Sequence, residues 1–442
     1  MKNDDLGKKD ERISVYLKVK QPSENDRLYY DISEDKKMIS LHDKIIKGES
    51  SKTQRIEVDK IFEDSNDEDM IYQEVCKNCI KECLDRNNFT FISYGDSTSE
   101  KYKLIFGNEE NGNKGIYYLL LKDLHKTIKH NSELVLNLSF LIVNGSILID
   151  LLKLMGNNKY LESLNEKDLI NIFGKEININ DTDIINNLKK IQSNSADENS
   201  KFIKTVLDSF KKMEENENIR FISCTYFCFS IYIINKRTKR TISTINFIII
   251  PGNELLTTKI TNPNTAKRDN ISNTKNVVEL SYTIEDIVRH LSTQTISEKN
   301  DTENMNKSKF MAVIGKIAFD VGNIESQFDR RYRIIGSIYA NTGLYYNTKD
   351  TLYFLFRCKK ITRQKFNYEL ALSLLEHEKK RQSSKFFRDS KAKESLIINS
   401  KNEIEEKLKL KDDQIYDLES KLKLQETKVA ELNTRIEKKM SI

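Results

Sequence analysis

Short β-rich runs alternate with helical patterns along most of this 442-residue chain, and this alternation most constrains its fold. Residues 13–19 alternate apolar and polar side chains, which is typical of a strand with one buried face, and Pro22 ends the run. A helical period follows over residues 69–84, and a β-rich run over residues 89–94 leads into Gly95. The pattern favours an α/β fold, in which helices cover both faces of a mostly parallel or mixed sheet.

The alternation continues to about residue 250. The patterns predict helices over residues 116–128 and 147–154, and strands over residues 134–143, 221–234 and 244–250, the last broken by Pro251 and Gly252. The stretches 194–200 and 294–308 contain almost no apolar side chains, so we expect them to be exposed loops. One large domain is therefore expected rather than several.

Composition excludes several classes of protein. The 73 basic and 67 acidic residues nearly balance at a net charge of +6, so no long-range attraction to nucleic acid is expected. No apolar run approaches the roughly 18 residues that a membrane span requires, so membrane insertion is not expected. Six cysteines and an N-terminus without an apolar signal region favour a reducing, cytoplasmic location.

The glycine turn after the β-rich run partly matches a phosphate-binding loop. A P-loop reads G-x-x-x-x-G-K-[ST], and it offers backbone N–H groups and a lysine to phosphates and a hydroxyl to Mg²⁺. Glu100 stands where the second glycine is needed, and Tyr102 stands where the hydroxyl is needed. Taken alone, the segment is better explained as a polar turn, because one glycine and one lysine at this spacing often occur by chance. Its residues are Gly95, Asp96, Ser97, Thr98, Ser99, Glu100, Lys101 and Tyr102.

The order of segments resembles the kinesin motor domain over residues 12–361. The resemblance rests on anchors in the family's order: residues 58–62 are similar to F-D-K-V-F, 93–95 to A-Y-G, 139–141 with 149–152 to S-Y-L-E-I-Y-N-E-x-I-R-D-L-L, and 350–352 with 357–361 to E-T-L-S-T-L-R-F-A-x-R-A-K-K-I. The resemblance implies a kinesin-like P-loop NTPase fold, with the site residues of such a fold at the matching positions.

Under this resemblance, the nucleotide site departs from the family at most positions. Cys224, followed by Thr225, replaces the arginine of the first switch, and Ile249 replaces the metal-associated aspartate of the second. Gly252 and Glu254 are retained, with structural roles favoured over catalytic ones. Like charges 4 Å apart cost about 1 kcal/mol in water and about 4 kcal/mol at an effective dielectric of 20, so the Glu100 carboxylate opposes a triphosphate. We therefore expect no catalytic residues, no metal and no bound ATP.

The adenine-side motif R-x-R-P is represented only by residues 18–22, where lysines replace both arginines and one residue is inserted. An ammonium group cannot reproduce the planar guanidinium of arginine. Track binding is also expected to be weak, because Glu285 and Asp286 lie where kinesins face the acidic surface of tubulin. Nearby lysines and arginines compensate in part, which leaves weak microtubule binding open.

Three cysteines, Cys76, Cys79 and Cys83, recur at helical spacing without a fourth ligand, so core packing is favoured over a metal site.

A heptad pattern predicts a coiled coil over residues 396–442, of homo- or heterodimeric type. Apolar residues recur every seven positions at Leu408, Ile415, Leu422, Val429 and Ile436, and Ile404, Leu418 and Leu432 lie four residues before three of them. Residues 362–395 are then expected to form a neck or linker, and residues 1–11 a disordered N-terminus.

Within the family, the chain is most similar to divergent fungal kinesin-like proteins that assist a class V myosin. This similarity implies a pseudo-motor: a non-motile, cytoplasmic, cytoskeleton-associated adaptor in polarised transport or secretion. Two alternatives remain open. The first is a divergent ATP-dependent microtubule motor. The second is a structural coiled-coil scaffold of a cytoskeletal or spindle complex.

Overall fold

The structure is a computed structural model that divides into two compact units, residues 1–366 and 367–442. It describes residues 13–21, 29–42, 53–63, 68–108, 113–144, 147–153, 174–176, 189–217, 225–252, 266–293, 308–318, 330–339 and 344–361. All of these lie in the first unit. The predicted disordered N-terminus, neck and coiled coil lie outside the described residues, so those three predictions stay predictions.

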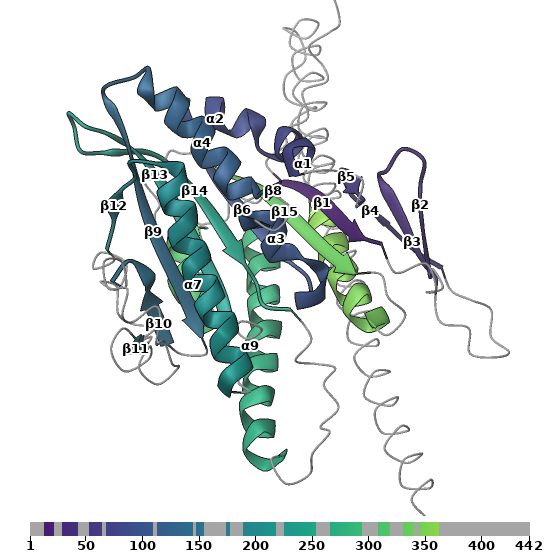
Figure 1. Ribbon diagram of the computed structural model, residues 1–442. Helices are drawn as coiled ribbons and strands as arrows, with labels where there is room; N and C mark the ends of the chain where they lie inside the picture. Colours follow the sequence, from purple (N-terminus) through teal and green to yellow (C-terminus); the bar gives the residue numbers. More distant parts are fainter. Residues whose placement is uncertain are drawn as a thin grey trace, which may run out of the picture. The chain divides into compact units, whose positions relative to one another are not determined.

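Ten of the described strands form one mixed sheet (Figure 1). The order is β11-β10-β9-β13-β14-β6-β15-β1-β5, and β12 pairs with β9. The pairs β14–β6, β6–β15, β15–β1 and β1–β5 are parallel, whereas β9, β10 and β13 pair antiparallel. The strands are β1 (Ile13–Lys20), β5 (Lys60–Phe62), β6 (Asn88–Tyr94), β9 (Leu134–Asn144), β10 (Ile147–Asp150), β11 (Gly174–Glu176), β12 (Ile191–Gln192), β13 (Thr225–Asn235), β14 (Thr241–Ile249) and β15 (Arg330–Tyr339).

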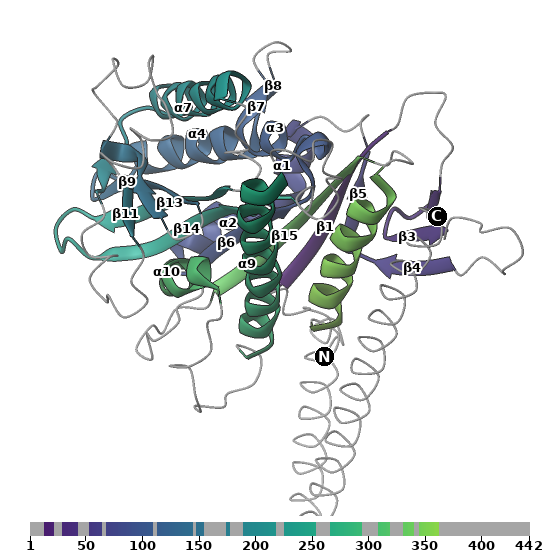
Figure 2. The ribbon, with the colours of Figure 1, turned by 90° about the horizontal axis from the view of Figure 1, so that it is seen from below.

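Helices cover both faces of this sheet (Figure 2). On one face lie α1 (Glu68–Val75), α2 (Lys77–Leu84), α3 (Lys101–Phe106), α4 (Ile116–Lys129) and α7 (Ala196–Glu217). On the other lie α9 (Ala266–Thr293), α10 (Lys309–Ala318) and a helix over residues 345–361. The prediction of a mixed α/β sheet with helices on both faces is confirmed.

The two faces bury alternate residues of the same strands, because successive side chains of a strand point to opposite sides. On β13, Phe227 and Phe229 join the core under α4, whereas Tyr226 and Cys228 join the core under α9 and α10. Burial on both sides explains why residues 225–233 are apolar or small throughout, without the alternation of a half-exposed strand.

Two local predictions are wrong. Residues 147–154 were expected to be helical, but 147–150 form β10, which pairs antiparallel with β9, followed by a short 3-10 helix over Leu151–Lys153. Residues 194–200 were expected to be a loop, but α7 begins at Ala196. The predicted helix over 69–84 is present, but it breaks at Cys76 into α1 and α2.

Smaller sheets were not predicted. The strands β2 (Tyr30–Ile32), β3 (Met38–His42) and β4 (Thr53–Glu57) form an antiparallel sheet, and β7 (Gly107–Asn108) pairs with β8 (Asn113–Lys114) before α4 begins. Among the described helices, none is both long enough and apolar enough to span a bilayer.

The acidic residues of α9 do not all face outward. Asp286 is fully buried; one carboxylate oxygen accepts the backbone N–H of Ser308 at 2.9 Å, and the other binds Arg289. Glu279 accepts the Ser308 hydroxyl at 2.9 Å and the Phe310 N–H at 3.1 Å. These contacts satisfy N–H groups at the start of α10. The expectation that Asp286 lies on an exposed track-facing surface is therefore wrong.

Candidate functional site

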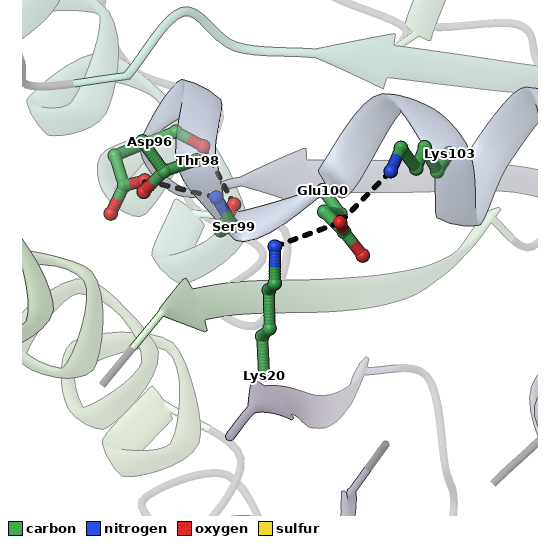
Figure 3. Close-up of polar contacts among 6 residues, drawn as sticks. All are labelled: Lys20, Asp96, Thr98, Ser99, Glu100 and Lys103. Atoms are coloured by element: carbon green, nitrogen blue, oxygen red, sulfur yellow. Dashed lines mark hydrogen bonds and ion pairs between the residues drawn. The ribbon is translucent and has the colours of Figure 1, made fainter. Parts of the chain in front are cut away.

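The glycine turn lies where β6 ends, between β14 and β15 on either side. In open α/β sheets, ligands bind outside the carboxyl ends of the parallel strands. A 3-10 turn over Ser97–Ser99 follows the strand, and α3 begins at Lys101. We refer to residues 95–102 as the loop; Figure 3 shows part of it with its ion pairs.

Gly95 is required by the close approach of β15. Its φ is +154°, and a Cβ atom built on it would lie 2.0 Å from the backbone oxygen of Ser337. A backbone oxygen cannot swing aside as the end of a side chain can. The tight turn out of β6 therefore depends on glycine at this position.

The Asp96 carboxylate folds back onto the loop (Figure 3). It accepts the Ser99 backbone N–H at 3.0 Å and the Thr98 hydroxyl, and the side chain is 1% exposed. The Ser99 hydroxyl donates to the Asp96 carbonyl at 2.6 Å. In a phosphate-binding loop, the backbone N–H groups are the donors to the anion. Here one of those N–H groups already has an anionic acceptor from the chain itself.

Glu100 adopts a left-handed backbone conformation, with φ of 62° and ψ of 23°. Its carboxylate lies between two ammonium groups, 2.8 Å from Lys20 of β1 and 2.9 Å from Lys103 of α3 (Figure 3). Partial burial raises the pKa of Glu100, but hydrogen bonds and charge attraction from the two lysines outweigh it and hold that pKa below its ordinary value. The carboxylate is therefore ionised at neutral pH.

Lys101 points inward rather than across the loop. Its side chain is 1% exposed, and its ammonium donates to the carbonyl oxygens of Gly95 at 2.5 Å and Ile250 at 2.8 Å. It thereby joins the start of the loop to the end of β14. Buried charged groups need such partners, because an ammonium without them is costly to remove from water.

Tyr102 packs against the aromatic core. Its ring makes an edge contact with Phe227 of β13 at a centroid distance of 5.8 Å, and the Lys101 ammonium lies 5.4 Å from its centroid. Ile249 is fully buried in the same core. Neither residue offers an oxygen that resembles a Mg²⁺ ligand of a P-loop protein.

The remaining predicted positions are partly described. Thr225 is fully buried at the start of β13, where its hydroxyl accepts from the Asn144 amide at 2.9 Å, and Gly252 is buried just after β14. Cys224 and Glu254 lie outside the described residues. The structure therefore brings the loop, the end of β14 and β13 together. Sequence reasoning missed Lys20 as the partner of Glu100 and Ile250 as a partner of Lys101.

A family model for the kinesin motor domain matches residues 15–310, more than half of the chain. The chain belongs to the kinesin motor domain family. A comparison with curated proteins gives no match. Among solved structures, one match is the C-terminal motor and motor homology domain of Kar3Vik1 fused to a synthetic heterodimeric coiled coil, with a TM-score of 0.55 and 15% identity over 78% of this chain and 85% of that one.

A second match is the motor domain of the Kar3-like kinesin from Ashbya gossypii, with a TM-score of 0.52 and 14% identity over 79% of this chain and 99% of that one. At these identities the two structures show a shared kinesin fold.

The family implies Mg-ATP, and the described residues of this kinesin-like loop do not fit it. The Lys101 ammonium, which would meet phosphates in a P-loop, is held by carbonyl oxygens below the loop. Residue 100 carries a carboxylate, and residue 102, whose counterpart in a P-loop supplies the metal-binding hydroxyl, is a tyrosine packed on Phe227.

The cysteine group of this kinesin-like domain belongs to the core. Cys76, Cys79 and Cys83 are buried against α4 and the sheet, and burial raises the pKa of Cys79 to about 12 and those of the other two well above their ordinary range. Among the described residues, no group of three or more potential ligands is placed to hold a metal.

We expect Cys76, Cys79, Cys83, Cys228 and Cys358 not to react with a chromogenic disulfide reagent in the native protein, because the attacking species is the thiolate and all five are buried. All six cysteines should react in guanidinium chloride. The measurement is thiol release before and after unfolding, with mass spectrometry to locate the labelled peptides. Rapid native labelling of any of the five would contradict this assignment.

Proposed function

We propose that this chain is a kinesin-like pseudo-motor, in which the motor fold serves as a scaffold and ATP is not turned over. The observation that carries the proposal is the internal pairing of the loop's charges. Lys101 binds two backbone carbonyl groups, and the Glu100 carboxylate bridges Lys20 and Lys103. A nucleotide would have to break these contacts before it gained any of its own.

The requirements of phosphoryl transfer also support the pseudo-motor proposal. Phosphoryl transfer depends on positioning and on charge stabilisation by lysine, backbone N–H groups and Mg²⁺. In this loop, the Ser99 N–H binds Asp96, and Tyr102 packs on Phe227. Each departure removes or occupies a group that would stabilise the transferring phosphate. The combined loss of these groups supports absent or very slow ATP hydrolysis rather than hydrolysis at an altered but useful rate.

The cellular part of the proposal is an adaptor role in polarised transport or secretion, in association with a class V myosin and the cytoskeleton. Its support is the resemblance to divergent fungal kinesin-like proteins, together with the heptad pattern over residues 396–442, which would pair the chain with a like or unlike partner. Residual weak microtubule binding is compatible with this role.

An active, divergent microtubule motor is the alternative. It is favoured by membership of the kinesin motor domain family and by the presence of Gly95 and Lys101 at their expected positions. A coiled-coil scaffold of a cytoskeletal or spindle complex is a second alternative, with the motor-like unit as a passive head. Capture of the partner by a chain that lacks residues 396–442 would contradict the scaffold reading.

The test of the proposed function is calorimetric titration of the full chain with ATP, in the presence and absence of Mg²⁺. We expect no saturable heat, which corresponds to a Kd weaker than about 1 mM. A micromolar Kd that requires Mg²⁺ would overturn the pseudo-motor proposal. Phosphate release stimulated by microtubules would establish the motor alternative in its place.

A further inference from the structure

We propose that the Glu100 carboxylate takes the place of an anionic ligand in the loop. Its ion pairs with Lys20 and Lys103 exclude polyphosphate anions from these two lysines. This inference rests on the proposed function, because it supplies the reason for the expected failure of nucleotide binding. One side chain, Glu100, accounts for the exclusion. Without its carboxylate, the loop would accept inorganic pyrophosphate.

The backbone at residue 100 favours glycine, yet glutamate is present. Its φ of 62° lies in the left-handed region, where a side chain other than glycine costs about 1 kcal/mol. Other non-glycine residues with positive φ in the described part of the chain are Lys36, Arg86 and Lys239. The conformation aims the Glu100 carboxylate at two lysines on different elements, β1 and α3. These contacts give the strained residue a physical role.

The cations around Glu100 form a cluster that an outside anion could use. Lys20 and Lys103 are both within 2.9 Å of the same carboxylate oxygen. The Lys20 ammonium also lies 4.9 Å from the centroid of the Tyr339 ring, which holds it at the end of β15. Lys20 lies 80 residues and Lys103 lies 3 residues from Glu100 in the chain, yet both contact its carboxylate. Loss of the Glu100 charge would leave these two lysines without the carboxylate that they share.

Asp96 has a different role from Glu100. Its carboxylate is almost fully buried and binds the Ser99 N–H within the turn, so it sets the shape of the loop. Glu100 is partly exposed, with a side-chain accessibility of 37%, and its carboxylate forms ion pairs with the side chains of Lys20 and Lys103. Neutralising Glu100 therefore changes charge at the mouth of the loop while it leaves the turn in place.

The experiment titrates the full chain with sodium pyrophosphate at low salt, without Mg²⁺. The variants are Glu100→Gln, which keeps the size of the side chain, and Glu100→Gly, which also relieves the left-handed backbone. The matched control is Glu74→Gln, because Glu74 of α1 lies outside the loop, forms a 2.7 Å ion pair with Lys60 of β5, and its loss changes net charge equally. The double variant Glu100→Gln with Lys20→Gln removes one proposed ligand.

We expect Glu100→Gln to bind pyrophosphate at least about tenfold more tightly than the native chain or Glu74→Gln. We expect the double variant to lose this gain. Equal binding by Glu100→Gln and Glu74→Gln would overturn the inference, as would a gain that appears only in Glu100→Gly, since backbone strain rather than charge would then exclude the anion. Mg-ATP binding by the native chain would instead overturn the proposed function, so the two failures are distinguishable.

Discussion

The variant Gly95→Ala is expected to lose about 3 kcal/mol of unfolding free energy, the combined cost of backbone strain and overpacking. The added Cβ would lie 2.0 Å from the Ser337 backbone oxygen, and φ at residue 95 is +154°. Relief requires β6 and β15, which pair in the middle of the sheet, to move apart. The measurement is urea denaturation followed by circular dichroism, with the midpoint and slope compared with those of the native chain.

Gly336→Ala is the control for this substitution, because Gly336 lies on the neighbouring strand. A Cβ there would meet the side chain of Leu355 at 2.5 Å, and a leucine side chain can change rotamer. We therefore expect a clearly smaller loss of stability. Equal losses for the two alanine variants would show that the backbone approach at Gly95 does not determine the stability of the turn.

Replacing Lys101 with alanine should destabilise the fold and leave nucleotide titrations unchanged. The side chain is 1% exposed, and its removal leaves a cavity and takes a donor from the carbonyls of Gly95 and Ile250. An unsatisfied buried acceptor costs about 1 to 3 kcal/mol, so we expect a loss of about 3 kcal/mol in total. Denaturant unfolding measures the loss, and calorimetry with ATP provides the second readout.

Lys101→Met separates the contributions of space and hydrogen bonding. Methionine fills much of the volume but has no donor for the two carbonyls, so its destabilisation should be smaller than that of alanine. In an active motor, both substitutions would weaken ATP binding. A native chain that binds ATP, combined with variants that do not, would therefore contradict the structural role proposed for Lys101.

Sequence patterns succeeded where one stretch of chain determines its own structure. The strand β13 and the helix α4 are both predicted correctly from their side-chain patterns. The continuous apolar run of β13 reflects burial on both faces, and the helical period of α4 reflects burial on one face. The pattern failed for residues 147–154, where apolar content suits a helix or a strand. Pairing with β9 decides the matter, and that pairing is set by hydrogen bonds to another segment.

The strand β15 shows why a central element can escape sequence reasoning. It lies between β6 and β1 in the sheet, yet it begins with arginines, which are typical of exposed segments. Arg330 donates to the Thr90 hydroxyl at 3.1 Å, and Arg333 donates to the Ser14 hydroxyl at 3.1 Å. These partners lie 240 and 319 residues away in the chain, so no local pattern predicts that the arginines can be buried.

The sequence by itself determined the α/β class and the segment order of the kinesin motor domain, and it predicts departures from the family's nucleotide site at Glu100, Tyr102 and Ile249. Only the tertiary structure decided where the displaced charges go. Lys20 meets Glu100, and Lys101 meets the end of β14, because parallel strands bring the ends of distant segments to one edge of the sheet. Side-chain identity is local information, but charge pairing depends on distances that only the folded sheet sets.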